Sequence, residues 1–214
     1  MAAGRGSRMM PLTEKIPKAM APYDGSTLIA NGIKRIKPFV PYIYITVGYK
    51  GALLSQHVID IGVSGLFDTS GKDNSWWIFN TLMKELNEPI FVLTCDNVIK
   101  LDFQMIANEY FNAGSPPAMV VPVKPIPGLE GDFIHKEKNV VTKLSREEAT
   151  DIYCSGIQII NPKKINNLIE PKENFYEVWS QLISIKQLFC SRTYPENWFG
   201  ADTLEQLSNL PSGL

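Results

Sequence analysis

Short apolar runs alternate with longer amphipathic segments along this 214-residue chain, and that alternation constrains the fold more than any other feature. The runs are apolar and rich in β-branched residues, so we expect buried β-strands at 42–47, 90–94, 118–123 and 157–160. We expect amphipathic helices at 26–36, 76–86, 103–113 and 175–188. Strands that alternate with helices predict an α/β fold, in which a mainly parallel sheet is covered on both faces.

Capping and turn-forming residues refine this outline. Ser26 or Thr27 is expected to cap the first helix, because either side chain accepts hydrogen bonds from the free N–H groups of a first turn. Pro122 lacks a backbone N–H, so we expect it at an edge of the sheet or at a strand end. The segment 124–146 is rich in glycine, proline and charge, and predicts a β-hairpin or flap beside a ligand site. The length fits a single domain, 1–214, that carries this flap.

Composition and charge exclude several classes of function. Hydrophobic residues make up 44% of the chain and charged residues 20%, as in ordinary globular proteins. The formal net charge of −1 provides no positive field for nucleic acid, and no apolar run is long enough to span a membrane. Three widely spaced cysteines favour buried, reduced thiols in a cytoplasmic protein. The two histidines have no evident catalytic partner, so we expect neither Ser-His-Asp nor Cys-His chemistry, and no zinc site.

The first twenty residues carry the strongest functional signal. Small side chains there would let the backbone approach a ligand closely, with N–H groups directed at phosphate oxygens. These residues are Ala2, Ala3, Gly4, Gly6 and Ser7. Arg8 then offers a planar cationic fork for phosphate, and Lys18 offers a compact positive charge. A disordered tail is the alternative, but the whole string is more specific than a lone Gly-x-Gly. The segment therefore predicts a triphosphate-binding loop.

The string small-small-Gly-x-Gly-Ser-Arg, followed by Pro11-Leu12-Thr13 and Pro17-Lys18, resembles the signature loop of the sugar-phosphate nucleotidyltransferases. The resemblance implies a Rossmann-like, three-layer nucleotidyltransferase fold with a mainly parallel central sheet and a small β flap. In that family an apolar strand precedes the loop, whereas this sequence begins at Met1, inside the expected end of that strand. We expect that upstream residues are missing; the alternative is that the central strand has been lost.

Two aspartates are candidates for a magnesium site. Asp96 follows the run 90–94, and open α/β sheets bind ligands at the carboxyl ends of their strands. The resemblance implies a metal-binding Asp at this strand end and a second carboxylate near the C-terminus. There, Gly200 replaces the Asp of many members, and Asp202 matches members with Asp or Asn before Thr. We assign Asp96 and Asp202 to Mg²⁺. The alternatives are a turn cap for Asp96, and a helix N-cap for Asp202 with Glu205 three residues on.

The residues expected around the nucleobase match the family less well. The segment 69–75 takes the place of the family's glycine-rich turn before a helix, without repeating its Gly-Thr-Ala-Gly pattern. Gly71, Asn74 and Ser75 are its nucleotide-binding candidates. A plain loop followed by a helix cap is the alternative.

The acceptor side also departs from the family pattern. Asn97, next to the first metal-binding candidate, is expected to contact the substrate. The segment 144–147 lacks the Glu-Lys-Pro of sugar members, so Arg146 is expected to replace the lysine that meets the acceptor phosphate. Gly156 remains where relatives carry Asn-Thr-Gly. These changes suggest an acceptor other than the commonest hexose 1-phosphates.

The resemblance implies a Mg²⁺-dependent enzyme that joins an NTP to a sugar 1-phosphate or similar phosphorylated metabolite and releases pyrophosphate, in sugar nucleotide biosynthesis. Its partners would be the NTP and the acceptor, without nucleic acid or membrane, and the oligomeric state stays open. Two alternatives are a cytidylyltransferase for a non-sugar phosphate such as phosphocholine, and a non-catalytic nucleotide-sensing domain of the same fold. A dinucleotide-binding oxidoreductase is disfavoured because the loop lacks a complete Gly-x-Gly-x-x-Gly.

Overall fold

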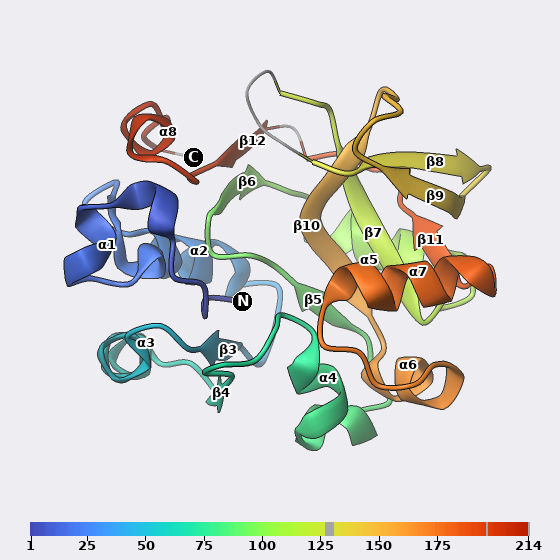
Figure 1. The fold of residues 1–214 in the computed structure, drawn as a ribbon, viewed down its shortest axis with the longest axis horizontal. Helices are drawn as coiled ribbons and strands as arrows, with labels where there is room; N and C mark the ends of the chain where they lie inside the picture. Colours follow the sequence, from blue (N-terminus) through green and yellow to red (C-terminus); the bar gives the residue numbers. More distant parts are fainter. Residues whose placement is uncertain (127–130, 196, 214) are drawn as a thin grey trace. The chain divides into compact units, whose positions relative to one another are not determined.

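The structure is a computed structural model that describes residues 1–126, 131–195 and 197–213. The chain forms two compact units, whose elements are labelled in Figure 1. Unit 1 comprises Met1–Lys72, Thr94–Lys100 and Asn197–Leu214, and unit 2 comprises Asp73–Leu93 and Leu101–Glu196. Among the described residues, no helix has the length and apolar character needed to cross a bilayer.

Unit 1 contains the N-terminal loop and three small strand pairs. Its helices are η1 (Ser7–Met9), α1 (Leu12–Lys15), η2 (Lys18–Met20), α2 (Leu28–Ile36), α3 (Gly51–Ile61) and α8 (Leu204–Ser208), where η marks a 3₁₀ helix. Its strands are β1 (Pro22–Tyr23), β2 (Ser26–Thr27), β3 (Tyr44–Val47), β4 (Gly65–Asp68), β6 (Asn97–Lys100) and β12 (Asn197–Gly200). β3 and β4 run parallel, whereas β1–β2 and β6–β12 are antiparallel.

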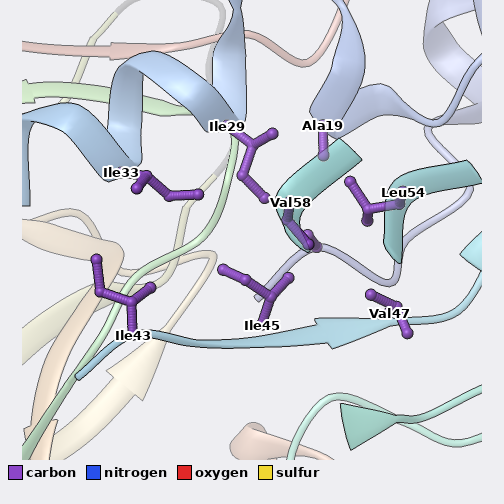
Figure 2. Close-up of a cluster of buried hydrophobic side chains, with 9 residues drawn as sticks. Ala19, Ile29, Ile33, Ile43, Ile45, Val47, Leu54 and Val58 are labelled. Atoms are coloured by element: carbon purple, nitrogen blue, oxygen red, sulfur yellow. The ribbon is translucent and has the colours of Figure 1, made fainter. Parts of the chain in front are cut away.

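The core of unit 1 forms where α2 and α3 pack against β3. Helix α2 begins after Thr27, whose hydroxyl oxygen accepts a hydrogen bond from the N–H of Ala30 at 3.2 Å. Thr27, rather than Ser26, is therefore the cap. Residues four apart share one face of a helix, so Ile29 and Ile33 point to the same side. Figure 2 shows the buried cluster that they join, with the labelled residues Ala19, Ile29, Ile33, Ile43, Ile45, Val47, Leu54 and Val58. Ala2 also belongs to this cluster.

Unit 2 is built on a six-stranded sheet in the order β5-β10-β7-β11-β9-β8. Its strands are β5 (Ile90–Val92), β7 (Ala118–Val123), β8 (Phe133–Glu137), β9 (Val140–Ser145), β10 (Tyr153–Ile160) and β11 (Leu188–Cys190). Its helices are α4 (Trp76–Asn80), η3 (Leu82–Glu85), α5 (Phe103–Asn112), α6 (Pro162–Leu168) and α7 (Phe175–Ser184). In Figure 1, α7 covers the near face of this sheet and the fainter α5 lies behind it.

The strand directions in this sheet are mixed. β7 and β11 run parallel, while β10 runs antiparallel to β5, β7 and β8. β8 and β9 form an antiparallel hairpin, as predicted for the segment 124–146. Residues 127–130 of that segment lie outside the described residues. A hairpin inserted between β7 and β10 lets the chain return antiparallel to β7 without a crossover helix.

Pro122 occupies the end of an interior strand. β7 lies between β10 and β11, so the strand is not at an edge of the sheet. β11 pairs only with the first half of β7, from Ala118 to Val120. Pro122 is thus already beyond β11, and it faces Cys154 of β10 beside a register shift. A strand end tolerates a residue without an N–H, which is the second of the two predicted positions.

The predicted helices at 76–86 and 175–188 are interrupted earlier than periodicity suggests. The first stops at Thr81, whose backbone is extended at φ −120° and ψ 178°. The Thr81 hydroxyl donates to the carbonyl of Trp77 and accepts from the N–H of Met83. The second ends at Ser184, because Leu188 begins β11. Local hydrogen bonds and sheet pairing therefore override the apolar period at these ends.

Candidate functional site

The chain's first three residues are hydrogen-bonded to two separate segments of unit 1. The N–H of Ala2 donates to the carbonyl of Thr46 in β3 at 3.2 Å, and the carbonyl of Met1 accepts from the N–H of Cys95 at 3.0 Å. A Cβ added to Gly48 would lie 2.9 Å from the Cβ of Ala3, so only glycine permits this approach. The predicted loop is thus anchored at its start.

The loop turns at Gly6, which has a left-handed backbone with φ of 65°. A Cβ there would lie 2.7 Å from the Cβ of Lys18, whereas a Cβ at Gly4 would have no atom within 4 Å. The Thr13 hydroxyl donates to the Gly6 carbonyl at 2.9 Å and fixes the turn. Gly6 therefore lets Lys18 pass beneath the loop, while Gly4 leaves open space in front of the backbone.

These two glycines give a matched prediction. Gly6→Ala is expected to lower the stability of the protein by about 1–3 kcal/mol, because the alanine would meet Lys18 and occupy a left-handed conformation. Gly4→Ala is expected to leave the melting temperature unchanged, since its Cβ would meet nothing. Thermal unfolding followed by circular dichroism measures both. Equal melting temperatures for the two variants would contradict this account of the loop.

Lys18 forms the centre of a charged cluster. Its Nζ lies 2.5 Å from Oδ2 of Asp96 and 2.7 Å from Oδ1 of Asp202. Nη2 of Arg8 lies 3.0 Å from the same Asp202 oxygen. The Lys18 side chain is only 10% exposed, and that of Arg8 is 64% exposed. Four residues assigned from the sequence therefore meet at one point, with a buried cation between two carboxylates and an exposed guanidinium at the rim.

The charged groups of this cluster keep one another ionised. Burial favours the neutral amine of Lys18, but the charge of Asp96 and the hydrogen bonds to both carboxylates outweigh it, so the pKa of Lys18 is raised. Burial likewise opposes ionisation of Asp96. The Lys18 ammonium and hydrogen bonds, among them one with Thr94, outweigh it and lower the pKa of Asp96. Both groups are therefore ionised at neutral pH.

The strand pair β6–β12 brings the two carboxylates together. Asn97 pairs with Gly200 at the end of this ladder, so Asp96 lies immediately beyond it next to β6 and Asp202 lies two residues beyond it after β12. The carbonyl of Asp96 accepts from the N–H of Ala201 at 3.0 Å and extends the pairing. This explains how residues 106 positions apart in sequence, numbered 96 and 202, share one cation.

The predicted alternative for Asp202, a helix cap, does not hold. The N-cap of α8 is Thr203, which forms a capping box with Gln206. The Asp202 N–H donates to Oε1 of Gln206 at 2.8 Å, so the backbone of Asp202 supports the cap while its carboxylate stays in the charged cluster. The Asp202 carboxylate is thus not used as the cap of α8.

The donor set fits a magnesium ion. Oxygens of Asp96 and Asp202 already converge on a single cation, the Lys18 ammonium, within 2.7 Å. Mg²⁺ characteristically takes one or two carboxylates, with water and substrate phosphates as its remaining ligands. In the described part of the chain, no group of three or more His, Cys, Asp or Glu residues is arranged to hold a metal. A metal here would therefore depend on phosphate oxygens, as a nucleotide-bound ion does.

The nucleobase candidates have local structural partners. Asn74 Oδ1 accepts from the N–H of Phe175 at 2.9 Å, and the Ser75 hydroxyl donates to the Lys172 carbonyl at 2.9 Å. Ser75 is fully buried. Both side chains thus hold the segment before α7 within unit 2. Gly71, in unit 1, has a φ of 70° and open space at its Cβ position.

The acceptor candidates are similarly engaged. Asn97 Oδ1 accepts from the Trp198 Nε1 at 3.1 Å across β6–β12. Nε of Arg146 lies 3.1 Å from Oδ1 of Asp132 on the hairpin, and the Arg146 side chain is 73% exposed. Gly156 adopts φ 79° in β10, where the register shifts. No sequence pattern indicates these partners, since they depend on strand register. Gly48 was likewise not predicted, although a glycine just after a buried strand often marks a close approach.

The class of this protein follows from a match to a known domain family. Residues 1–133 match the MobA-like NTP transferase domain. This match covers more than half of the chain, and the chain therefore belongs to the MobA-like NTP transferase family. The resemblance drawn from the N-terminal loop is confirmed.

The chain is similar in sequence to part of several curated proteins. The bifunctional protein GlmU of Methanococcus maripaludis is 34% identical over 109 residues, which cover 51% of this chain and 23% of that protein. Mannose-1-phosphate guanyltransferase of Debaryomyces hansenii is 24% identical over 205 residues, which cover 88% of this chain and 56% of that protein. The chain thus spans from about a quarter to just over half of the length of these relatives.

Solved structures confirm the α/β nucleotidyltransferase fold. CTP:phosphocholine cytidylyltransferase of Streptococcus pneumoniae superimposes with a TM-score of 0.74 at 19% identity, covering 96% of this chain and 92% of that chain. Inositol-1-phosphate CTP transferase of T. maritima gives 0.74 at 18% identity, covering 97% and 89%. At these identities the likeness concerns the fold alone.

Proposed function

We propose that this chain is a Mg²⁺-dependent nucleotidyltransferase that joins an NTP to a sugar 1-phosphate or similar phosphorylated metabolite and releases pyrophosphate. One observation carries the proposal: Lys18 lies between Asp96 and Asp202, directly beneath a loop of small residues that leads to Arg8. A cation shared by two carboxylates beside such a loop suits a metal–triphosphate ligand. Membership of an NTP transferase family supports the same reading.

The charges in the cluster account for the chemistry. A phosphate oxygen of the acceptor attacks the α-phosphorus of the NTP in line, the bond from that phosphorus to the pyrophosphate oxygen breaks, and pyrophosphate leaves with the electron pair. Arg8 and Lys18 stabilise the negative charge that develops on the leaving group. Asp96 and Asp202 would hold Mg²⁺, which neutralises and orients the phosphates when bound. The acceptor phosphate is already charged at neutral pH, so the step needs no catalytic histidine.

The acceptor is proposed from the relatives. Mannose-1-phosphate guanyltransferase aligns with 88% of this chain, so GTP with mannose 1-phosphate is the first pair to test. A second candidate is a cytidylyltransferase for a non-sugar phosphate, because Arg146 stands where a lysine is expected and is paired with Asp132. A cytoplasmic location is proposed because NTPs are available there and because Cys95, Cys154 and Cys190 are free thiols.

A pyrophosphate-release assay tests the proposal. The protein is incubated with Mg²⁺, each of ATP, GTP, CTP, UTP and dTTP, and an acceptor panel of mannose 1-phosphate, glucose 1-phosphate, N-acetylglucosamine 1-phosphate and phosphocholine. We expect acceptor-dependent pyrophosphate release for at least one pair, and its loss when EDTA removes the metal. If the protein binds a nucleotide but none of the NTP–acceptor pairs turns over, the result would instead identify a nucleotide-sensing domain.

A further inference from the structure

Tyr49 fastens both arms of the N-terminal loop. Its N–H donates to the carbonyl of Ala3 at 3.0 Å, and its hydroxyl donates to the carbonyl of Thr13 at 2.9 Å. Thr13 in turn donates from its own hydroxyl to the carbonyl of Gly6. Tyr49, which follows β3, therefore holds the start of the loop at Ala3 and its end at Thr13. It holds the turn at Gly6 indirectly, through Thr13.

The ring of Tyr49 also holds a cation of the loop. The guanidinium carbon of Arg5 lies 5.5 Å from the centroid of the Tyr49 ring, within the range of cation–π attraction. Nζ of Lys50 lies 5.5 Å from the same centroid. Arg5 is solvent-exposed and follows Gly4, where an added Cβ would have no atom within 4 Å.

Arg5 differs from the other two cations of the loop region. Lys18 and Arg8 are both engaged with carboxylates. Within residues 1–126, 131–195 and 197–213, Arg5 has no salt bridge, so its guanidinium keeps its donors for another anion. A guanidinium binds phosphate through two parallel N–H groups, and prior orientation by an aromatic ring reduces the rotamer entropy lost on binding.

We propose that Arg5 is a further phosphate-binding residue of this site, and that Tyr49 is the positioning residue that orients it and the loop. The inference rests on the proposed function, because it takes the loop to be the triphosphate site. It adds a second exposed guanidinium to the one supplied by Arg8. Tyr49 acts through Arg5 and the loop carbonyls without touching the ligand.

Binding of Mg²⁺-tripolyphosphate, measured by isothermal titration calorimetry, tests this without a nucleobase or turnover. Arg5→Gln is expected to weaken binding by about 10-fold, the effect of losing one charge-assisted contact. Tyr49→Leu is expected to weaken it similarly. The double variant should bind no more than about 3-fold worse than Arg5→Gln, because residues that act as one unit are not additive. Tyr49→Phe keeps the ring and loses only the hydroxyl contact, so its loss should be smaller.

The chain offers a matched control. The guanidinium carbon of Arg35 lies 5.7 Å from the centroid of the Tyr23 ring, in the same unit but on α2. Arg35→Gln removes this cation–π pair, together with the 3.4 Å hydrogen bond from Nη2 of Arg35 to the Tyr23 hydroxyl, and should leave tripolyphosphate binding unchanged. Unchanged binding in Arg5→Gln, or losses that multiply to about 100-fold in the double variant, would overturn the proposal. Arg5→Gln and Tyr49→Phe keep it falsifiable if Tyr49→Leu does not fold.

Steady-state kinetics separate positioning from a general structural defect. In the acceptor–NTP pair that turns over, Arg5→Gln and Tyr49→Phe should raise KM for the NTP while kcat stays within about 2-fold, the pattern of lost uniform binding. A fall in kcat at constant KM would contradict the role of Arg5 and Tyr49 in phosphate binding. If the wild type binds tripolyphosphate through Arg5 but releases no pyrophosphate, the proposed reaction fails while this inference stands. Absence of tripolyphosphate binding by the wild type would sink the inference itself.

Discussion

Asp96→Asn is expected to reduce kcat for pyrophosphate release by about 100- to 1,000-fold, comparable with the loss of one preorganised charged contact in other active sites. Asparagine has nearly the same shape as aspartate but no charge, so it cannot neutralise Mg²⁺. Lys18 would keep its contact with Asp202 at 2.7 Å, and the chain is therefore expected to remain folded. Pyrophosphate release at saturating substrate, together with circular dichroism, measures both outcomes.

Asp202→Asn should reduce kcat by the same factor. Its carboxylate contacts the same Lys18 ammonium as Asp96, from the end of the partner strand β12. Asp60→Asn is the matched control: Asp60 is exposed on α3 and accepts a hydrogen bond from Gln56. It should retain wild-type turnover. Wild-type kcat in Asp96→Asn at saturating Mg²⁺ would exclude Asp96 as a metal ligand and leave the second magnesium candidate without its partner.

Lys18→Met is expected to abolish turnover. It is also expected to make the protein more stable as the pH falls, opposite to the wild type. In the wild type the pKa of Asp96 is lowered in the folded state, mainly by Lys18 against the opposing effect of burial. The resulting stability is present above the ordinary aspartate pKa of 3.8 and is lost as pH falls below it. The pKa of Lys18 is raised, so its contribution is complete below 10.5 and is lost as pH rises beyond that value.

The variant leaves two carboxylates close together without the Lys18 ammonium between them, and Arg8 remains paired with Asp202. Burial and the neighbouring negative charge of Asp202 then raise the folded-state pKa of Asp96, and the folded protein binds more protons than the unfolded chain. Its melting temperature should therefore rise as pH falls from 7 toward 5, whereas that of the wild type should not. Lys15→Met, which removes an exposed lysine from α1, serves as control and should follow the wild type. A Lys18→Met profile parallel to the wild type would show that the pairing contributes no net stability.

Local parts of this fold could be read from the sequence because their causes lie within a few residues. The run 118–123 forms β7 over the predicted residues, and the helix predicted at 103–113 forms α5 over Phe103–Asn112. The hairpin predicted within 124–146 is present as β8 and β9. The break at Thr81 was missed because it depends on side-chain hydrogen bonds that oppose an otherwise regular apolar period.

Part of the candidate site could also be predicted from the sequence, but from motifs and a family resemblance rather than from local structure. The loop residues and Lys18 belong to one contiguous string, whereas Asp96 and Asp202 were assigned from a family resemblance and a strand end. Asn74 and Ser75 had equally plausible sequence contexts, yet their side chains hold the segment 172–175. No spacing along the chain distinguishes a side chain that faces a ligand from one that faces another loop.

By itself, the sequence predicted a phosphate-binding loop, since glycine, alanine and arginine have their backbone freedom and charge wherever they are placed. It also indicated some of the helices and strands, among them α5 and β7, through periodicity and capping, but it did not predict α3 (Gly51–Ile61). Only the tertiary structure decided that one ammonium serves carboxylates 78 and 184 residues away. That outcome depends on the register of β6 with β12 and on the left-handed turn at Gly6 that admits Lys18. Register is a property of two paired strands, and neither strand encodes it alone.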